Sequence, residues 1–559
     1  MRTPPHNTPL RPIATSAINT PLWERCMKFE TARACVIGAF IGLGLAAAPQ
    51  ASHADWLRAE SERFIVYSEG SERSLRDYVQ KLEIFDRVMQ YKSGIPISTT
   101  PPRKLPIYLV SGRPGLLKIN PNSGDITVGT YFAADEDIFA AAVRTSNSDG
   151  VSGQDVLMHE YAHHFMLGNS PGAYPAWFVE GFAEYYMTAA IDVNKNEVLL
   201  GGYNANRAYW IMQEDWIPLD ILLKSRPDEV RRESQRATYY PIAWLLTHWF
   251  FSDPARLQQF QAYLTDVSQG GDSVEAMQRA TGMSLDQLRA ALRRYTRVRL
   301  TGNRIQGQFP TADITVTRLP RSANDLLLIN QRMKLGVPED DRAAVNQEVT
   351  RLAARHGEDP FALLVAGHAG LRLGDAPAGE RALLRLIEIE PDNVEALQLL
   401  AEDRLKKTRE TDDEDEALTF RREARDYLAR AYAAASNDYR TLMLMTEMRQ
   451  GQSSYPNDND MLAMGLTLDR APQLASVRFN YASALTEKGD RAEAIAVLRP
   501  LANNPHGGGA SKAAVRMIAA LEAGGALPDL SDDEIAPQIS QTEPEAPTPE
   551  GASPNAPAS

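Results

Sequence analysis

The segment DVLMHEYAH, residues 155–163, constrains the fold and the chemistry of this chain more than any other part of its sequence. Residues four apart on an α-helix lie on nearly the same face, so the imidazoles of His159 and His163 can bind one metal ion together. Glu160 lies one step around the helix, where its carboxylate can reach a water molecule on that metal. The segment therefore predicts a metal-binding helix with a built-in proton acceptor.

Local signals agree on a helix over residues 153–167. Ser152 and Asp155 form a plausible capping box, and Gly168 supplies a stop. His164 lies about 140° around the helix from His159. We therefore expect His164 to be a polar neighbour of the site rather than a ligand.

A second helix is predicted over residues 176–188, where Pro175 opens the sequence AWFVEGFAEYY. Glu180 and Glu184 are four residues apart and share a face of this helix. Catalytic zinc needs a third protein ligand and an open position for water. A downstream His, as in HExxHxxGxxH, is absent here, so a Glu on this second helix is the alternative source.

HEYAH followed by WFVEGFAEYY resembles the gluzincin metallopeptidases, and most of all their peptidase MA-like members, over residues 150–190. The resemblance implies Zn2+ as the cofactor and Glu180 as the third ligand. It also implies that Glu184 is a carboxylate bonded to the free nitrogen of a ligand histidine, His159. Val179 stands where the aminopeptidases of this group have Asn, and their GxMEN motif is absent, so the resemblance does not extend to an aminopeptidase.

The resemblance implies hydrolysis of a peptide bond by Glu-assisted attack of a zinc-bound water. Glu160 would take the proton and later pass it to the leaving amine. A further donor should stabilise the tetrahedral oxyanion. Tyr239 and Tyr240 are the candidates, because gluzincins often place a Tyr or His on a later helix, and His248 is a third. The two tyrosines could instead be core residues, and packing is the expected role of His248.

Mixed α and β patterns over residues 55–305 predict an α+β zincin-like metallopeptidase domain. Strands are expected at 64–68, 105–110 and 138–144, and further helices at 73–90, 238–251 and 256–297. The strand at 138–144 is either an edge strand that pairs with an extended substrate or an ordinary strand of the sheet.

After a linker predicted at 306–322, the sequence pattern changes from mixed α and β to helical. Residues 323–525 predict an all-α solenoid, in which 360–393 and 475–508 each span 34 positions and share a Gly-Asp at the same offset. This pattern resembles the tetratricopeptide repeat, whose concave face can bind a protein partner. Residues 526–559 are acidic and Pro-rich and predict a disordered tail.

Residues 1–54 are typical of a secretory signal peptide, with an apolar run at 34–48 and cleavage expected after Ala54. Met27 is an alternative start. The expected destination is the periplasm or the medium of a bacterium. The apolar run is short for a membrane span of about 20 residues, although an uncleaved anchor is the alternative.

The net charge of -13 argues against nucleic acid as a partner, because nucleic-acid binding needs a basic surface. The expected partners are a peptide or protein substrate and a protein on the repeats. No stable membrane span is expected after signal cleavage. Two other functions compete with an active peptidase: a repeat-based scaffold protein with a slow or inactive zinc site, and a metal hydrolase of non-peptide amides in the cell envelope. The intact His-Glu pair favours an active enzyme.

Overall fold

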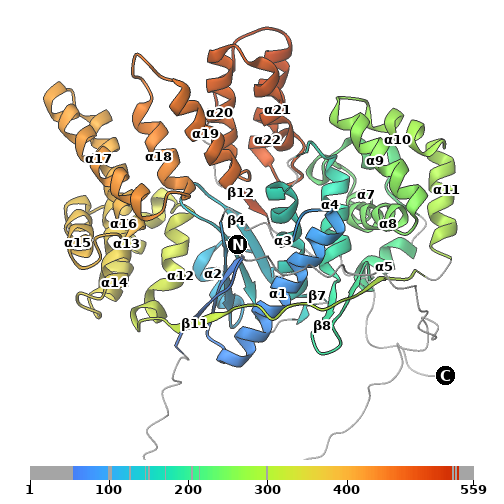
Figure 1. The fold of residues 1–559 in the computed structure, drawn as a ribbon, viewed down its shortest axis with the longest axis horizontal. Helices are drawn as coiled ribbons and strands as arrows, with labels where there is room; N and C mark the ends of the chain where they lie inside the picture. The colour runs from blue at the N-terminus through green and yellow to red at the C-terminus, as the bar shows by residue number, and fades with distance from the viewer. Residues whose placement is uncertain are drawn as a thin grey trace, which may run out of the picture.

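The protein structure is a computed structural model that describes residues 55–540. Short gaps lie at 98–102, 125–126, 145–146, 149–150, 170–171, 203–204, 213–214, 298–299, 532–533 and 535–537. An N-terminal α/β region built on a mixed sheet is followed by a C-terminal, repeat-like run of helices (Figure 1). The predicted signal peptide, 1–54, and the last part of the predicted tail, 541–559, lie outside the described residues.

The main sheet has the strand order β11-β1-β2-β3-β5-β4-β12 in the described part of the chain. Its strands are β1 (Leu57–Glu60), β2 (Phe64–Ser68), β3 (Leu105–Val110), β4 (Gly129–Ala133), β5 (Ile138–Val143), β11 (Thr315–Arg318) and β12 (Gln538–Ser540). β2, β3 and β5 run parallel, and the other neighbours pair antiparallel. The predicted strands at 64–68, 105–110 and 138–144 are thus β2, β3 and β5.

Strand β5 lies inside the sheet, between β3 and β4. All six of its residues, IFAAAV, are buried, as expected for a strand with neighbours on both sides and packed faces. Of the two readings of 138–144, the edge strand is therefore wrong and the ordinary sheet strand is confirmed.

Both edges of the sheet come from segments that the sequence places outside the metal-binding domain. β11 lies in the predicted linker, 306–322, and pairs with β1. β12 lies in the predicted disordered tail, 526–559, and pairs with β4. An uncovered strand edge presents N–H and C=O groups without partners, which is the physical reason for both pairings. The linker and this part of the tail therefore belong to the sheet.

The helices divide between the two regions. Those of the N-terminal region are α1 (Glu72–Ser93), α2 (Arg113–Ile119), α3 (Gly153–Asn169), α4 (Ala176–Met187), α5 (Ala205–Met212), α6 (Leu219–Lys224), α7 (Glu233–Ala237), α8 (Tyr239–Phe251), α9 (Pro254–Ser268), α10 (Ser273–Thr281) and α11 (Leu285–Tyr295). Small strands accompany them: β6 (Asn147–Ser148), β7 (Val151–Ser152), β8 (Ala190–Asp192), β9 (Glu197–Leu200) and β10 (Asn303–Gln306). Those of the repeat region are α12 (Ser322–Lys334), α13 (Glu339–Ala353), α14 (Pro360–Leu373), α15 (Ala376–Ile389), α16 (Val394–Glu410), α17 (Glu414–Ala434), α18 (Tyr439–Arg449), α19 (Asp458–Arg470), α20 (Ala475–Lys488), α21 (Arg491–Ala502) and α22 (Gly508–Glu522). Within the described ranges, no helix is both long and apolar enough to cross a membrane.

Helices cover both faces of the sheet. Alternate side chains of a strand point to opposite faces, and β3 shows the consequence. Ile107 and Leu109 enter a core with α1, α3, α4 and α8, whereas Tyr108 and Val110 enter a second core with α2 and α12. Because α12 belongs to the repeat region, the sheet buries apolar surface from both parts of the chain.

The helix that carries Glu180, α4, packs against α8 at a close crossing. A Cβ atom on Gly181 would stand 2.3 Å from Thr247 Oγ1 and 2.5 Å from the carbonyl oxygen of Ala243. No larger side chain fits between the two helices at this distance. Gly181, the glycine of EGFAE, therefore sets how closely α4, and with it Glu180, approaches α8.

Replacing Gly181 by alanine should force α4 away from α8. We expect the free energy of unfolding to fall by about 1–3 kcal/mol, the usual effect of overpacking, because one of the blocking atoms is a backbone carbonyl. Urea unfolding measures this change. Gly168→Ala is the matched control, since nothing lies within 4 Å of its Cβ position. Alanine favours a helix by about 0.5–1 kcal/mol there. Equal destabilisation of both variants would contradict the packing argument.

The repeat region arches over the sheet, and its last helices, α20 to α22, stand above α3, β4 and β12 (Figure 1). The predicted copies at 360–393 and 475–508 each contain a helix pair, α14 with α15 and α20 with α21. In both copies the glycine of Gly-Asp ends one helix and the aspartate begins the next. Gly489 has a φ of 90°, which glycine adopts without strain.

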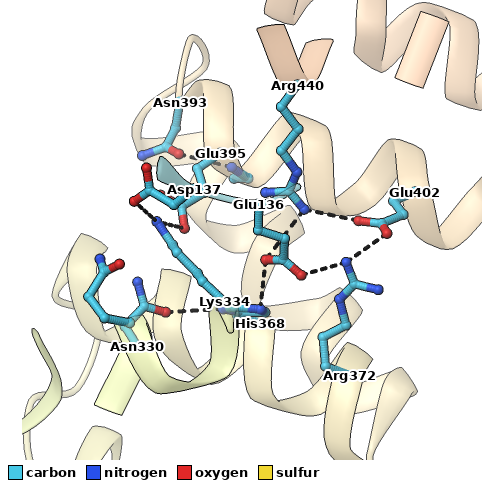
Figure 2. A network of polar contacts seen from close by, with 12 residues as sticks. Glu136, Asp137, Asn330, Lys334, His368, Arg372, Asn393, Glu395, Glu402 and Arg440 are labelled. Carbon is cyan, nitrogen blue, oxygen red and sulfur yellow. Dashed lines mark hydrogen bonds and ion pairs between the residues drawn. The ribbon is translucent and has the colours of Figure 1, made fainter. Parts of the chain in front are cut away.

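A polar cluster joins the turn between β4 and β5 to the repeat helices (Figure 2). Glu136 on this turn lies 2.6 Å from Arg372 and 3.1 Å from His368 Nε2. Both residues come from α14. The cluster, called the acidic-turn cluster below, consists of Glu136, Asp137, Lys334, His368, Arg372, Glu402 and Arg440. The repeat region is thus docked through charges as well as through apolar packing.

Candidate metal centre

Helix α3 begins as the sequence predicts. The backbone N–H of Ser152 donates to the Asp155 carboxylate at 2.9 Å, and that of Asp155 donates to Ser152 Oγ at 3.1 Å. This reciprocal pair is a capping box. His159 and His163 follow on one buried face, with their Nε2 atoms 3.0 Å apart.

Helix α4 adds a carboxylate to the two imidazoles. Glu180 Oε2 lies 3.5 Å from His159 Nε2 and 3.6 Å from His163 Nε2. Ligand atoms about 2.0–2.2 Å from a tetrahedral metal ion stand roughly 3.3–3.6 Å from one another. The two distances from Glu180 fall in this range, and the 3.0 Å between the two histidine nitrogens is slightly shorter, so the three residues predicted as ligands could hold a metal ion.

The cluster is a buried site that favours positive charge. Burial raises the pKa of Glu180, but His506 and His163 outweigh this effect and hold the pKa well below its usual value. Its Oε2 atom is too far from either ligand histidine for an ordinary hydrogen bond. Because a buried, incompletely paired carboxylate is unfavourable, a cation among these donors would offset its desolvation.

Glu160 borders the cluster without joining it. It follows His159 on α3 and is 1% exposed. It lines a small cavity together with His163 and His506. Among the described residues, the donor atoms that converge do not include those of Glu160. This place beside the ligands suits a proton acceptor better than a ligand.

Glu184 lies behind His159. Its Oε1 is 3.6 Å from His159 Nδ1, the ring nitrogen that faces away from the cluster. This is the predicted pair of residues, but the distance exceeds that of a hydrogen bond. Arg207 on α5 holds Glu184 instead, through two hydrogen bonds of 2.8 and 2.9 Å. Sequence reasoning missed Arg207, because a single arginine outside any motif gives no signal.

Replacing Arg207 by alanine should weaken metal binding without removing a ligand. Outer partners of metal ligands typically contribute 10- to 100-fold to affinity, so we expect the Kd for zinc to rise by about that factor. Competition with a chelating dye measures this Kd. Arg304→Ala, which breaks an ion pair with Glu197 on β9, is the control and should leave the Kd unchanged. A wild-type Kd in Arg207→Ala would show that the arginine does not support the site.

The two predicted oxyanion donors differ in their surroundings. The hydroxyl of Tyr239 donates to the carbonyl oxygen of Ser225 at 2.8 Å and is therefore engaged by the backbone. The guanidinium carbon of Arg207 lies over the Tyr240 ring, 5.1 Å from the centre of that ring. Burial, with a further contribution from Glu180, raises the pKa of Tyr240 well above its usual value. Because the hydroxyl of Tyr239 is engaged by the backbone, Tyr240 is the better candidate.

Two other histidines from the sequence analysis lie outside the cluster. His164 Nδ1 is 2.9 Å from the Tyr131 hydroxyl, and burial lowers the pKa of His164 to about 3. His248 Nδ1 is 2.8 Å from the Tyr295 hydroxyl, and burial lowers the pKa of His248 to about 4. Both are buried histidines outside the converging set, so His164 is a polar neighbour rather than a ligand, as the sequence predicts.

A fourth donor comes from the far end of the chain. His506 lies in the turn between α21 and α22, and its Nε2 is 2.8 Å from Glu180 Oε1. One ligand atom from each of His159, His163, Glu180 and His506 lies within 4.8 Å of the others. Burial lowers the pKa of His506, but Glu180 and Glu160 outweigh it and raise the pKa to about 9. Nothing in the surrounding sequence, NNPHGGG, marks this histidine as a ligand.

Comparisons with known proteins add little to this geometry. No protein-family model matches the chain, and no curated protein matches it. Among solved structures, it is similar to a thermophilic TPR protein from Thermus thermophilus, at 17% identity and a TM-score of 0.30. The match covers 36% of this chain and 99% of that one. Similarity at this TM-score is too low to assign the repeats to a family.

Proposed function

We propose that this chain is an exported, zinc-dependent peptidase of the gluzincin type, with a repeat region that binds a protein partner or the substrate. The observation that carries the proposal is the convergence of His159 Nε2, His163 Nε2 and Glu180 Oε2 at separations of 3.0–3.6 Å. The buried carboxylate of Glu160 stands beside them. This arrangement supports the roles of ligands and base that the HExxH and EGxAE motifs imply.

Zinc is the metal that these donors favour. Two imidazoles and one carboxylate form the ligand set of catalytic zinc in His2Glu sites. Magnesium and calcium prefer oxygen ligands. Both cysteines, Cys26 and Cys35, precede the predicted cleavage site, so a thiolate site is not available to the mature chain. When bound, zinc would polarise the scissile carbonyl and acidify the attacking water.

The roles of the surrounding side chains follow from their places. Glu160 accepts a proton from the attacking water and donates it to the leaving amine. Tyr240, which stays protonated, donates a hydrogen bond to the developing oxyanion. Glu184, clamped by Arg207, orients the ring of His159 from behind.

The test of this proposal is the zinc content and hydrolytic activity of purified residues 55–559. We expect about one zinc ion per chain by elemental analysis. We also expect cleavage of an unfolded protein that stops on chelation and returns with zinc. Absence of zinc after reconstitution would overturn the metal site. Cleavage of cell-wall material, with the unfolded protein left intact, would replace the peptidase by a hydrolase of non-peptide amides.

One observation favours a second function, a repeat-based binding protein with little or no activity. Structural zinc sites have four protein ligands, whereas catalytic sites keep one position open. His506 brings a fourth donor to within 2.8 Å of Glu180. In that case zinc would fasten the repeats to the sheet, and the repeats would carry the function.

A further inference from the structure

His506 is presented to the metal cluster by the fold around it. Its backbone N–H donates to Asn504 Oδ1 at 2.9 Å, which shapes the turn. Arg226 of the N-terminal region donates to the carbonyl oxygen of Ala502 at 3.3 Å, at the end of α21. The turn is therefore held from both regions, and its histidine is only 18% exposed.

The ring of His506 lies against the cluster, beside His163 and Glu180. It crosses the ring of His163 at 71°, with centroids 5.2 Å apart. Its Nε2 belongs to the set of four donor atoms that lie within 4.8 Å of one another. If all four donors bound one tetrahedral metal ion, no position would be left for water or for the substrate carbonyl.

The space beside the cluster is too small for a peptide. The cavity lined by Glu160, His163 and His506 has a volume of about 50 Å³. Sites for organic ligands typically have about 300–1,000 Å³. The cavity is far smaller than such sites, so a substrate requires a more open conformation.

The chain also covers the nearby edge of the sheet. Tyr131 and Ala133 of β4 line the same cavity. β12 pairs with them, placing Gln538 opposite Ala133 and Ser540 opposite Tyr131. An extended peptide binds such an edge by adding a strand, and here the chain's own segment occupies it. The His506 turn thus lies against the cluster, and β12 occupies the neighbouring edge of the sheet.

We propose that His506 is a fourth protein ligand of the metal, so that the conformation described here is a latent form of the enzyme. The inference rests on the proposed function, since a filled position matters only where the metal must bind water and substrate. Movement of the repeat region away from α3 withdraws His506 and opens the position and the cavity together.

The acidic-turn cluster is the contact that must loosen for this movement (Figure 2). Glu136 is the carboxylate to which His368, Arg372 and Arg440 converge. Removing it leaves His368 without this carboxylate and leaves Arg372 and Arg440 to share Glu402 alone, which weakens the docked state. Glu136→Ala therefore loosens the repeat region without changing any donor of the metal cluster.

The test uses residues 55–559 with zinc or with Co2+, whose visible absorption reports the geometry and ligands of the site independently of activity. We expect His506→Ala to change the cobalt spectrum and to raise the Kd for zinc about tenfold or more. At saturating zinc, cleavage of an unfolded protein should become about 10- to 100-fold faster, as for an open form populated at about 1–10%. Glu136→Ala should also cleave faster, with the wild-type ligands retained.

The control is His356→Ala, which removes a repeat histidine that lies 3.0 Å from Asp325, and wild-type values are expected for it. A cobalt spectrum of His506→Ala identical to that of the wild type would overturn the ligand assignment, whatever the cleavage rates. A changed spectrum with no hydrolysis in any variant would support the ligand assignment and overturn the peptidase and its latency. Failure of this inference and failure of the proposed function are therefore told apart.

Discussion

Replacement of Glu160 by glutamine should abolish peptide cleavage while zinc stays bound. Glutamine preserves the volume of a side chain that is 1% exposed, so the packing around the cluster is kept. It cannot accept the proton of the attacking water. A general acid–base group contributes about 10²–10⁴-fold to the rate, and Glu160 acts in both proton transfers. We expect kcat to fall at least about 10³-fold at a zinc content of about one per chain.

The same substitution is best measured twice, in the wild type and together with His506→Ala. The His506→Ala variant lacks the proposed fourth ligand. Its cleavage rate is expected to be higher, so the fall in rate caused by Glu160→Gln is easier to measure in it. Glu62→Gln is the matched control, because Glu62 is a partly exposed carboxylate that lies 3.6 Å from Arg87. Cleavage at the wild-type rate by Glu160→Gln would mean that another group is the base.

Replacement of Glu180 by alanine should have the largest effect on metal binding. Glu180 supplies the one anionic donor of the converging set in the described part of the chain. Without it, the charge of a buried zinc ion is uncompensated among neutral imidazoles. We expect the Kd for zinc to rise by more than about 100-fold, beyond the 10- to 100-fold typical of outer partners.

Thermal unfolding with and without zinc gives an independent measure of the same loss. A ligand at 100 times its Kd stabilises the folded state by about 2.7 kcal/mol, so zinc should raise the Tm of the wild type and hardly that of Glu180→Ala. Glu197→Ala, on β9, is the control and should respond to zinc like the wild type. Full zinc occupancy in Glu180→Ala would place the third ligand elsewhere.

Regular elements with strong local patterns were predictable from the sequence. Strands β2 and β3 have the predicted bounds, and α3 and α4 begin at the predicted residues. The high charge of the acidic stretch TRETDDEDEA, 408–417, favours a loop between two helices, but α16 runs to Glu410 and α17 starts at Glu414. Asp413 accepts backbone N–H groups at the start of α17, where acidic residues favour a helix.

The short edge strands were not predictable. β11 reads TVTR and β12 reads QIS, and neither has the length or alternation that marks a strand. They are strands because the open edges of the sheet supply their hydrogen-bond partners. The positions of these edges depend on the whole sheet, which no local pattern records.

The sequence by itself determined the chemistry of the candidate site: His159, Glu160 and His163 on one helix and Glu180 on the next. Helical periodicity is local, so spacing along the chain already places these side chains on common faces. Only the tertiary structure decided that Arg207 clamps Glu184 and that His506 meets Glu180. Those contacts join segments far apart in the chain. They arise because the sheet and the repeat helices bury apolar surface against each other, and spacing along the sequence does not encode this packing.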